Sequence, residues 1–258
     1  MTSALHITAP RVLRSEWSKF FSLRSTWIAL AAATVLVLAM GAITGISYDP
    51  GGEDAGRVDP VRFTLLGTQF SQIVIAVLGI LVTAGEYSTG MIRSSLAAVP
   101  RRTPVLWAKA AVFTAVAFAA TLATAFAAFP LAQAFLDGTD MSISISDPGV
   151  VRALTGTAAA LALTGAFTLA LGALLRSVPG AIGAYIGCVL ILPQVLGMLP
   201  FDAVKDAVKY LPLEAADALS TLHRAEGVLA PGPALLVLGA WVTAALVAAA
   251  LLLRRRDV

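Results

Sequence analysis

The chain has 258 residues, of which 58% are hydrophobic and only 13% are charged, and its mean hydropathy is +0.86. A water-soluble globule of this composition would lack the polar residues needed to cover its surface, so the composition predicts a membrane protein. The formal net charge of +3 is spread along the chain instead of being gathered in a basic domain, which argues against nucleic acid as a partner.

The N-terminal segment, residues 1–26, contains an amphipathic pattern over residues 11–24. The apolar face consists of Leu13, Trp17, Phe20 and Phe21, and Lys19 lies with the basic and polar residues of the other face. Pro10 suits the first turn of a helix, where its missing N–H is not needed. The pattern predicts a membrane-surface helix on the inner leaflet. A basic tail that merely orients the first span is the alternative.

Six apolar stretches are each long enough to cross about 30 Å of hydrocarbon as a helix, which needs about 20 residues. They cover residues 27–47, 65–84, 105–129, 153–175, 178–199 and 234–253. With Lys109 assigned to the cytoplasmic edge of the third stretch, no Asp, Glu, Lys, Arg or His is left inside them. Because helices satisfy their own backbone groups in lipid, we expect an all-α integral membrane protein with six transmembrane helices, forming one domain over residues 1–258.

The basic residues predict how the chain is oriented. If the six stretches alternate in direction, twelve basic residues fall on the side of the two termini and six on the other side. An excess of Lys and Arg marks the cytoplasmic side of a membrane protein. We therefore expect cytoplasmic N- and C-termini and a location in the plasma (inner) membrane of a bacterium.

The fourth and fifth stretches are joined by only a few residues around Arg176 and Ser177, which predicts a closely packed antiparallel hairpin. Small residues at four-residue spacing are typical of packed helices in membranes. They are Ala158, Ala162, Ala166 and Ala170 in the fourth stretch, and Gly183 and Gly187 in the fifth. Residues 200–232 keep a helical period that Pro212 interrupts, which indicates two short amphipathic helices on the outer face. An ordinary surface loop there is the alternative.

The chain offers few groups for catalysis or for metal binding. His6 and His223 fall on opposite sides of the membrane in this topology, and Cys188 is the single cysteine. The sequence holds no GxxxxGK[ST] phosphate-binding loop, so we expect any ATP hydrolysis to occur in a separate subunit. We expect no catalytic residue and no cofactor in this chain.

A polar, basic segment joins the second and third stretches. It contains Glu86, Gly90, Pro100, Arg102 and Lys109 in the spacing Glu-x3-Gly-x9-Pro-x-Arg-x6-Lys. Together with six spans, cytoplasmic termini, an amphipathic N-terminal helix and a long segment before the last span, this pattern resembles the permease subunits of ABC-2 type ABC transporters. The resemblance covers the whole chain in topology and residues 86–109 in motif. The chain departs from the family at Met91-Ile92, where Thr-Leu is common, and at Arg101, where a small residue is common.

The resemblance implies partners and a site. In such transporters two permease chains, as a homodimer or a heterodimer, work with two copies of a separate ATP-binding subunit. The loop after the second span carries a coupling helix that contacts the ATPase, and here it would occupy residues 86–96. The implied contact residues are Glu86, Tyr87, Gly90, Met91, Ile92, Arg93, Leu96, Pro100 and Arg102. Arg101, Arg102 and Lys109 have an alternative role as anchors for lipid phosphates, which the sequence favours for Arg101 and Lys109.

In a transporter, spans without charge would suit an amphipathic or lipid-like cargo better than a bare ion, and export is the more natural direction. Two other functions stay open on the sequence. A membrane-embedded enzyme acting on lipid or peptide would have Glu86 and Tyr87 as its candidate pair. A membrane anchor that recruits an ATPase without moving any cargo would need no catalytic groups.

Overall fold

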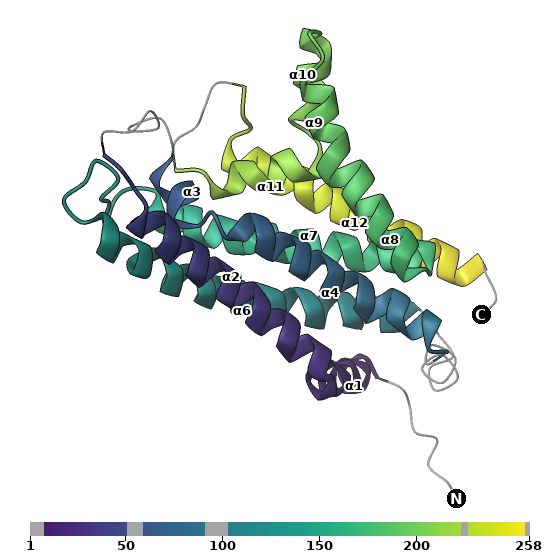
Figure 1. The fold of residues 1–258 in the computed structure, drawn as a ribbon. Helices are drawn as coiled ribbons and strands as arrows, with labels where there is room; N and C mark the ends of the chain where they lie inside the picture. The colour runs from purple at the N-terminus through teal and green to yellow at the C-terminus, as the bar shows by residue number, and fades with distance from the viewer. Residues whose placement is uncertain (1–7, 51–58, 91–102, 223–226, 256–258) are drawn as a thin grey trace, which may run out of the picture.

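The computed structural model describes residues 8–50, 59–90, 103–222 and 227–255, and every regular element in these ranges is a helix (Figure 1). In chain order they are α1 (Ala9–Ser22), α2 (Arg24–Ile46), α3 (Pro60–Thr64), α4 (Thr68–Ser88), α6 (Thr103–Leu136), α7 (Val150–Leu175), α8 (Val178–Ala184), the π-helix η1 (Tyr185–Ile191), α9 (Leu192–Gly197), α10 (Asp202–Val208), α11 (Pro212–Ser220) and α12 (Pro231–Arg255). The expected all-α fold is confirmed for the described part of the chain.

Six helical runs in the described residues are long and apolar enough to cross a membrane: α2, α4, α6, α7, the run from α8 to α9, and α12. Each overlaps one predicted stretch, so the prediction of a multi-pass membrane protein is confirmed. Two helices end well beyond the predicted C-terminal boundary, since α4 continues to Ser88 and α6 to Leu136. Hydropathy marks only the apolar part of a helix, and these helices continue through Glu86 and Pro130.

Helix α7 lies at the centre of the bundle, where it packs against α4, α6, α11 and α12. The predicted small-residue stripe consists of Ala158, Ala162, Ala166 and Ala170, all at most 2% exposed. The backbones of α4 and α7 approach so closely that a Cβ added at Gly79 would collide with the carbonyl oxygen of Gly165. The stripe therefore serves helix packing, as predicted.

The fifth span departs from the expected hairpin. α8 begins beside α4 and α7, and the run then diverges from α7 towards α10 (Figure 1). Tyr185 is buried and its hydroxyl accepts a hydrogen bond from Gln72 Nε2 at 3.0 Å. Beyond it, Ile191 and Val195 are exposed. Gly183 and Gly187 face no described atom, so the predicted close packing of this hairpin is wrong. The surface of α7 is already covered by its four other neighbours.

The segment before α12 is helical on both sides of Pro212, as predicted, so the alternative of an ordinary loop is wrong. α10 carries mostly exposed residues. α11, by contrast, packs against both α7 and α12, with Leu213 and Leu219 buried. The apolar residues that predicted α11 thus pack within the bundle, and this burial is more than the sequence pattern indicated.

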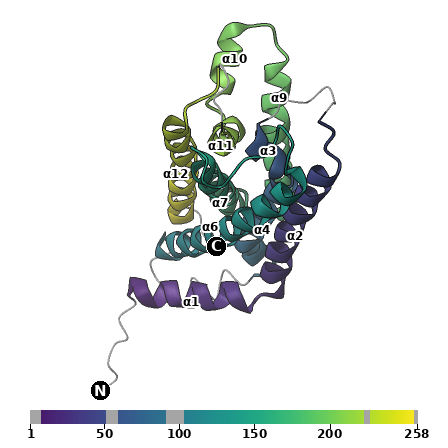
Figure 2. The same cartoon turned by 90° about the vertical axis from the view of Figure 1, so that its left-hand side faces the viewer.

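Helix α1 lies across one end of the bundle and at a steep angle to the spans (Figure 2). The end of α4, the start of α6 and the last turns of α12 meet at this same end, where Glu86, Lys109 and Leu253 line one small cavity. The described termini, in α1 and α12, are thus on one side of the bundle. This arrangement brings the last turn of α4 close to α1.

Candidate functional site

The end of α4 determines how the chain enters the predicted coupling segment. The Ser88 and Thr89 hydroxyls each donate to the carbonyl oxygen of Gly85 at 2.9 Å. Gly90 follows with a φ of +72°, the left-handed conformation with which glycine commonly ends a helix. A continuous helix over residues 86–96 is therefore wrong, because Glu86 to Ser88 form the last turn of α4 and the chain turns at Gly90. Residues 91–102 lie outside the described ranges. They include Met91, Ile92, Arg93, Leu96, Pro100, Arg101 and Arg102.

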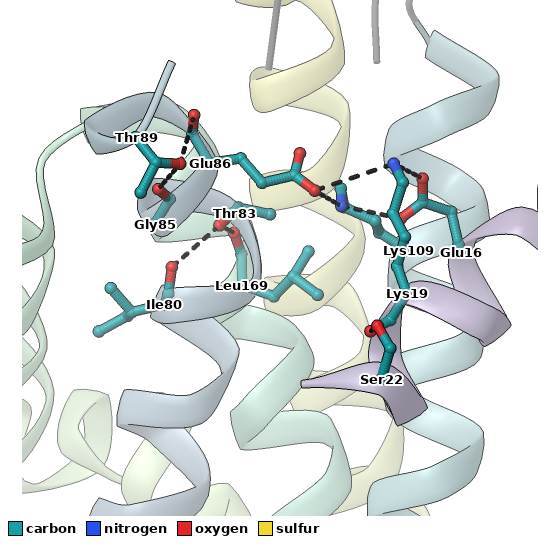
Figure 3. Close-up of polar contacts among 10 residues, drawn as sticks. All are labelled: Glu16, Lys19, Ser22, Ile80, Thr83, Gly85, Glu86, Thr89, Lys109 and Leu169. Atoms are coloured by element: carbon teal, nitrogen blue, oxygen red, sulfur yellow. Dashed lines mark hydrogen bonds and ion pairs between the residues drawn. The ribbon is translucent and has the colours of Figure 1, made fainter. Parts of the chain in front are cut away.

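Four charged side chains from three helices meet beside this turn (Figure 3). Lys109 Nζ of α6 lies 2.6 Å from Glu86 Oε1 of α4 and 2.8 Å from Glu16 Oε2 of α1. Lys19 Nζ of α1 lies 2.8 Å from Glu16 Oε1 and 4.0 Å from Glu86 Oε1. We call Glu16, Lys19, Glu86 and Lys109 the ion cluster. It ties α1, α4 and α6 together at one point.

Three of the four side chains of the ion cluster are almost completely shielded from solvent. The side chains of Glu16, Glu86 and Lys109 are 5%, 8% and 6% exposed, while Lys19 is 34% exposed. Buried charges are tolerated when they are paired and hydrogen-bonded, and two acids with two bases give this cluster no net charge. Lys109 is thus an interior residue of α6. Its position at this end of the bundle agrees with an edge of the third span, but the alternative of a lipid-phosphate anchor is wrong, because Lys109 is buried and paired with two carboxylates.

The second carboxylate oxygen of Glu86 differs from the first. Glu86 Oε2 is buried and has no hydrogen-bond partner among the described residues. Glu86 also borders a cavity of about 20 Å³ that Thr83, Tyr87 and Lys109 help to line. A cavity of this size has room for one water molecule. Glu86 therefore combines an oxygen held by Lys109 with a buried one whose hydrogen-bonding capacity is not used by the described residues.

Two further contacts connect the end of α4 to α7. The Arg176 guanidinium, at the C-cap of α7, lies over the Tyr87 ring at 5.0 Å from its centroid, a typical cation–π geometry. One turn earlier, Thr83 Oγ1 donates to the carbonyl oxygen of Leu169 at 2.8 Å (Figure 3). The last two turns of α4 are therefore held by α1, α6 and α7 together.

The buried face of α1 is not the one that the sequence pattern indicated. Val12, Glu16 and Phe20, four residues apart, face the bundle, and Phe20 makes an edge-on contact with Phe113 of α6. Trp17, in contrast, is 49% exposed, and Phe21 is partly buried. The apolar face predicted to lie in lipid is split, since Phe20 belongs to the core.

Sequence reasoning named Glu86 and Lys19 but missed Glu16 and the interior position of Lys109. One signal was available for Glu16, which is the single acidic residue of α1 and stands midway between Val12 and Phe20. An acidic residue on an apolar face needs a cationic partner. Its partner lies 93 positions away in the chain, so periodicity alone could not identify it.

The described residues contain no group of three His, Cys, Asp or Glu side chains suited to a metal ion. Comparisons with protein-family models, with curated proteins and with solved structures find no significant match. Function is therefore inferred from the geometry of the ion cluster and from the sequence motif that leads into it.

Proposed function

We propose that the chain is the membrane-spanning permease subunit of an ABC transporter of the ABC-2 class. It would work with two copies of a separate ATP-binding subunit and with a second permease chain. One observation carries the proposal: the ion cluster joins α1 and α6 to the last turn of α4, directly before the segment that the resemblance assigns to the ATPase. A permease needs such a junction at the point where force enters the membrane domain.

The contacts support a mechanism of coupled movement. ATP binding closes the two nucleotide-binding subunits and displaces residues 91–102, and the displacement reaches α4 at Glu86. Lys109 holds Glu86 and Glu16 at once, so α1, α4 and α6 move as one body. The contact of Tyr87 with Arg176 carries the same motion to α7. Rigid-body shifts of packed helices are a common way to open and close a transport pathway.

The composition of the spans supports an amphipathic or lipid-like cargo and the direction of export. Apart from the ion cluster, the described middle parts of the long helices carry no charged residue, and the polar side chains buried there are mostly threonines. The excess of basic residues on the side of the termini supports cytoplasmic N- and C-termini, in the plasma membrane of a bacterium.

The geometry weighs against the enzyme alternative. Glu86 Oε1 is engaged by Lys109 at 2.6 Å, and the Tyr87 ring is stacked under Arg176. Both residues of the candidate pair are thus occupied in joining helices. The anchor alternative shares all the geometry of a permease and differs only in moving no cargo.

The first test is co-purification. The tagged chain is extracted from native membranes, its companions are identified by mass spectrometry, and ATP hydrolysis is assayed in lipid discs. We expect a P-loop ATPase to be retained, and we expect Glu86→Gln to uncouple its hydrolysis from the permease. Lys205→Gln, on exposed α10, is the matched control and should behave as the wild type.

The possible results separate the alternatives. If no ATPase is retained and no hydrolysis occurs, the permease proposal fails. If an ATPase is retained and Glu86→Gln hydrolyses ATP with normal coupling, the role of the ion cluster in coupling fails. If the wild type binds and stimulates the ATPase but moves none of a panel of fluorescent lipids and amphiphiles, the anchor is favoured.

A further inference from the structure

An open groove lies between α1 and α6 on the outside of the bundle, away from the ion cluster. Its volume is about 370 Å³, and it is lined by Leu13, Arg14, Trp17, Ala111, Val112 and Ala115. Ala111 and Ala115 are one turn apart on α6 and both are exposed. The small alanine side chains leave room between the two helices, so the groove follows from the sequence of α6.

The wall of the groove on α1 is held in place by aromatic contacts. The Trp17 and Phe21 ring centroids are 4.6 Å apart, and Phe21 in turn lies 5.3 Å from the Trp27 ring of α2. The indole nitrogen of Trp27 donates to the carbonyl oxygen of Phe21 at 3.0 Å. Trp17 is therefore fixed by packing although it is half exposed. Tryptophan in such a position is typical of the boundary between lipid headgroups and acyl chains.

The charge of the groove follows from the ion cluster. Glu16 is the single acidic residue of α1, and it points into the bundle, where Lys109 and Lys19 neutralise it. Arg14 is exposed at the groove and makes no ion pair among the described residues. The groove thus combines one positive charge at the level of α1 with an apolar floor that runs along α6.

We propose that this groove binds one anionic glycerophospholipid. Its phosphate lies against the Arg14 guanidinium, and part of one acyl chain lies along Ala111 and Ala115 beside the Trp17 ring. Arginine is well suited to phosphate oxygens, because its planar guanidinium presents several donors in a fixed geometry. The inference rests on the proposed position of α1 at the membrane surface, and it is independent of the proposed ATPase.

The test uses the fluorescence of Trp17. A chain with Trp107→Phe and Trp241→Phe keeps Trp17 together with Trp27, and the same chain with Trp17→Phe gives the Trp27 signal to be subtracted. Each is reconstituted into phosphatidylcholine vesicles that contain increasing fractions of brominated phosphatidylglycerol or of brominated phosphatidylcholine. We expect half-quenching at about a fivefold lower fraction of the brominated phosphatidylglycerol, the preference that one basic residue gives near an anionic lipid.

Two substitutions and one control make the test specific. Arg14→Gln should abolish the preference, and Ala115→Phe should abolish it by filling the groove while leaving the charge in place. Arg24→Gln is the matched control, because Arg24 is exposed at the start of α2 and does not line the groove. A chain with Trp241 as its single tryptophan should show no preference. Helical content measured by circular dichroism verifies that each variant is folded.

Three results would overturn the inference. Equal quenching of Trp17 by both brominated lipids would mean that the groove holds only unselected bilayer lipid. The same preference in the Arg14→Gln chain would exclude the phosphate contact. Displacement of the quenching lipid by soluble glycerol phosphate would show a site for the headgroup alone. None of these measurements involves ATP hydrolysis, so their failure is distinct from failure of the permease proposal.

Discussion

Lys109 lies between two carboxylates where all three groups are nearly removed from solvent. Each of these charges loses hydration on folding, and the loss is offset only while its partners remain. The members of the ion cluster are not equivalent. Without Glu86, Lys109 keeps Glu16 as a partner. Without Lys109, both carboxylates are left with the half-exposed Lys19 alone.

The first prediction concerns this asymmetry. We expect Lys109→Met to lower the free energy of unfolding by about 3–5 kcal/mol, the usual cost of removing one partner from a buried ionic group. Glu86→Gln should cost clearly less. Denaturant unfolding in mixed micelles gives both values, with the exposed Lys205→Met as control. A Lys109→Met chain as stable as the control would show that the carboxylates are not buried as described.

The sequence could name part of this site and not the rest. Glu86, Gly90 and Lys109 stood out because they stand in the spacing that resembles the permease family. The pairing of Glu16 with Lys109 joins α1 to α6 across 93 positions, and it depends on how helices pack. Local patterns contain no information on such a contact. For the same reason the burial of Lys109 was not predictable, since a charge near a span end is hydrated in most proteins.

At the scale of elements, the contact between α4 and α7 sets the spacing of the bundle centre. Gly79 of α4 lies against the backbone of Gly165 in α7, and Gly172 of α7 lies against the side chain of Thr83 in α4. Close approach of this kind lets helices in lipid gain dispersion contacts over their whole length. It also leaves no room for one added carbon.

We therefore expect Gly79→Ala to destabilise the chain by about 1–3 kcal/mol, because the new methyl group must separate two backbones. Gly239→Ala in α12 is the matched control. Its Cβ would meet no described atom, and alanine favours a helix over glycine by about 1 kcal/mol. Thermal unfolding in detergent should show opposite signs for the two variants. Equal effects would contradict the close contact of α4 with α7.

Helix α11 carries two carboxyl groups that are costly to ionise in the folded chain. Burial raises the pKa of both Glu214 and Asp217; Asp217 adds to the rise at Glu214, and Arg62 opposes it at both. Arg62 and Asp217 form an ion pair at 3.1 Å. The folded chain therefore binds these two protons more tightly than the unfolded chain. The resulting stability is fully present below the ordinary pKa values of 4.5 and 3.8 and is lost as the pH rises through the raised values.

The pH dependence gives the third prediction. Glu214→Gln removes one carboxylate that is costly to ionise, so at pH 7 the melting temperature of the variant should exceed that of the wild type by about 1–2 °C. The expected difference is small because Glu214 is only partly buried and solvent weakens its interactions. Near pH 4 the two melting temperatures should coincide. A difference that stays constant from pH 4 to pH 7 would mean that Glu214 ionises normally in the fold.

At the scale of the whole molecule, the six spans and their order were predictable because each is a long, continuous run of apolar residues. How much of each span would be buried inside the bundle was not predictable. α7 and α12 have similar hydropathy, yet two thirds of the α7 span is buried inside the chain and only one third of the α12 span is. Lipid and protein interior are equally apolar, so hydropathy cannot separate the two environments. The burial of α11 was missed for the same reason.

Orientation is tested on the intact cell. In a Cys188→Ser background, we expect Ser146→Cys, in the loop after α6, to react with a membrane-impermeant maleimide added from outside. Ser22→Cys, at the end of α1, should react only after permeabilisation. Both serines are exposed, so accessibility to solvent is matched. The reverse pattern would invert the proposed topology and place residues 91–102 beyond the reach of a cytoplasmic ATPase.

The length of α6 fixes where the bilayer must end. Its 34 residues make a rod of about 51 Å, whereas the hydrocarbon core is about 30 Å thick. For an upright helix with Lys109 at one boundary, about 20 residues at 1.5 Å each bring the other boundary to Phe129. Pro130, which leaves the carbonyl of Phe126 without its helical partner, then stands where water can hydrate that oxygen. Lys109 and Pro130 thus mark, along α6, the two boundaries of the hydrocarbon core.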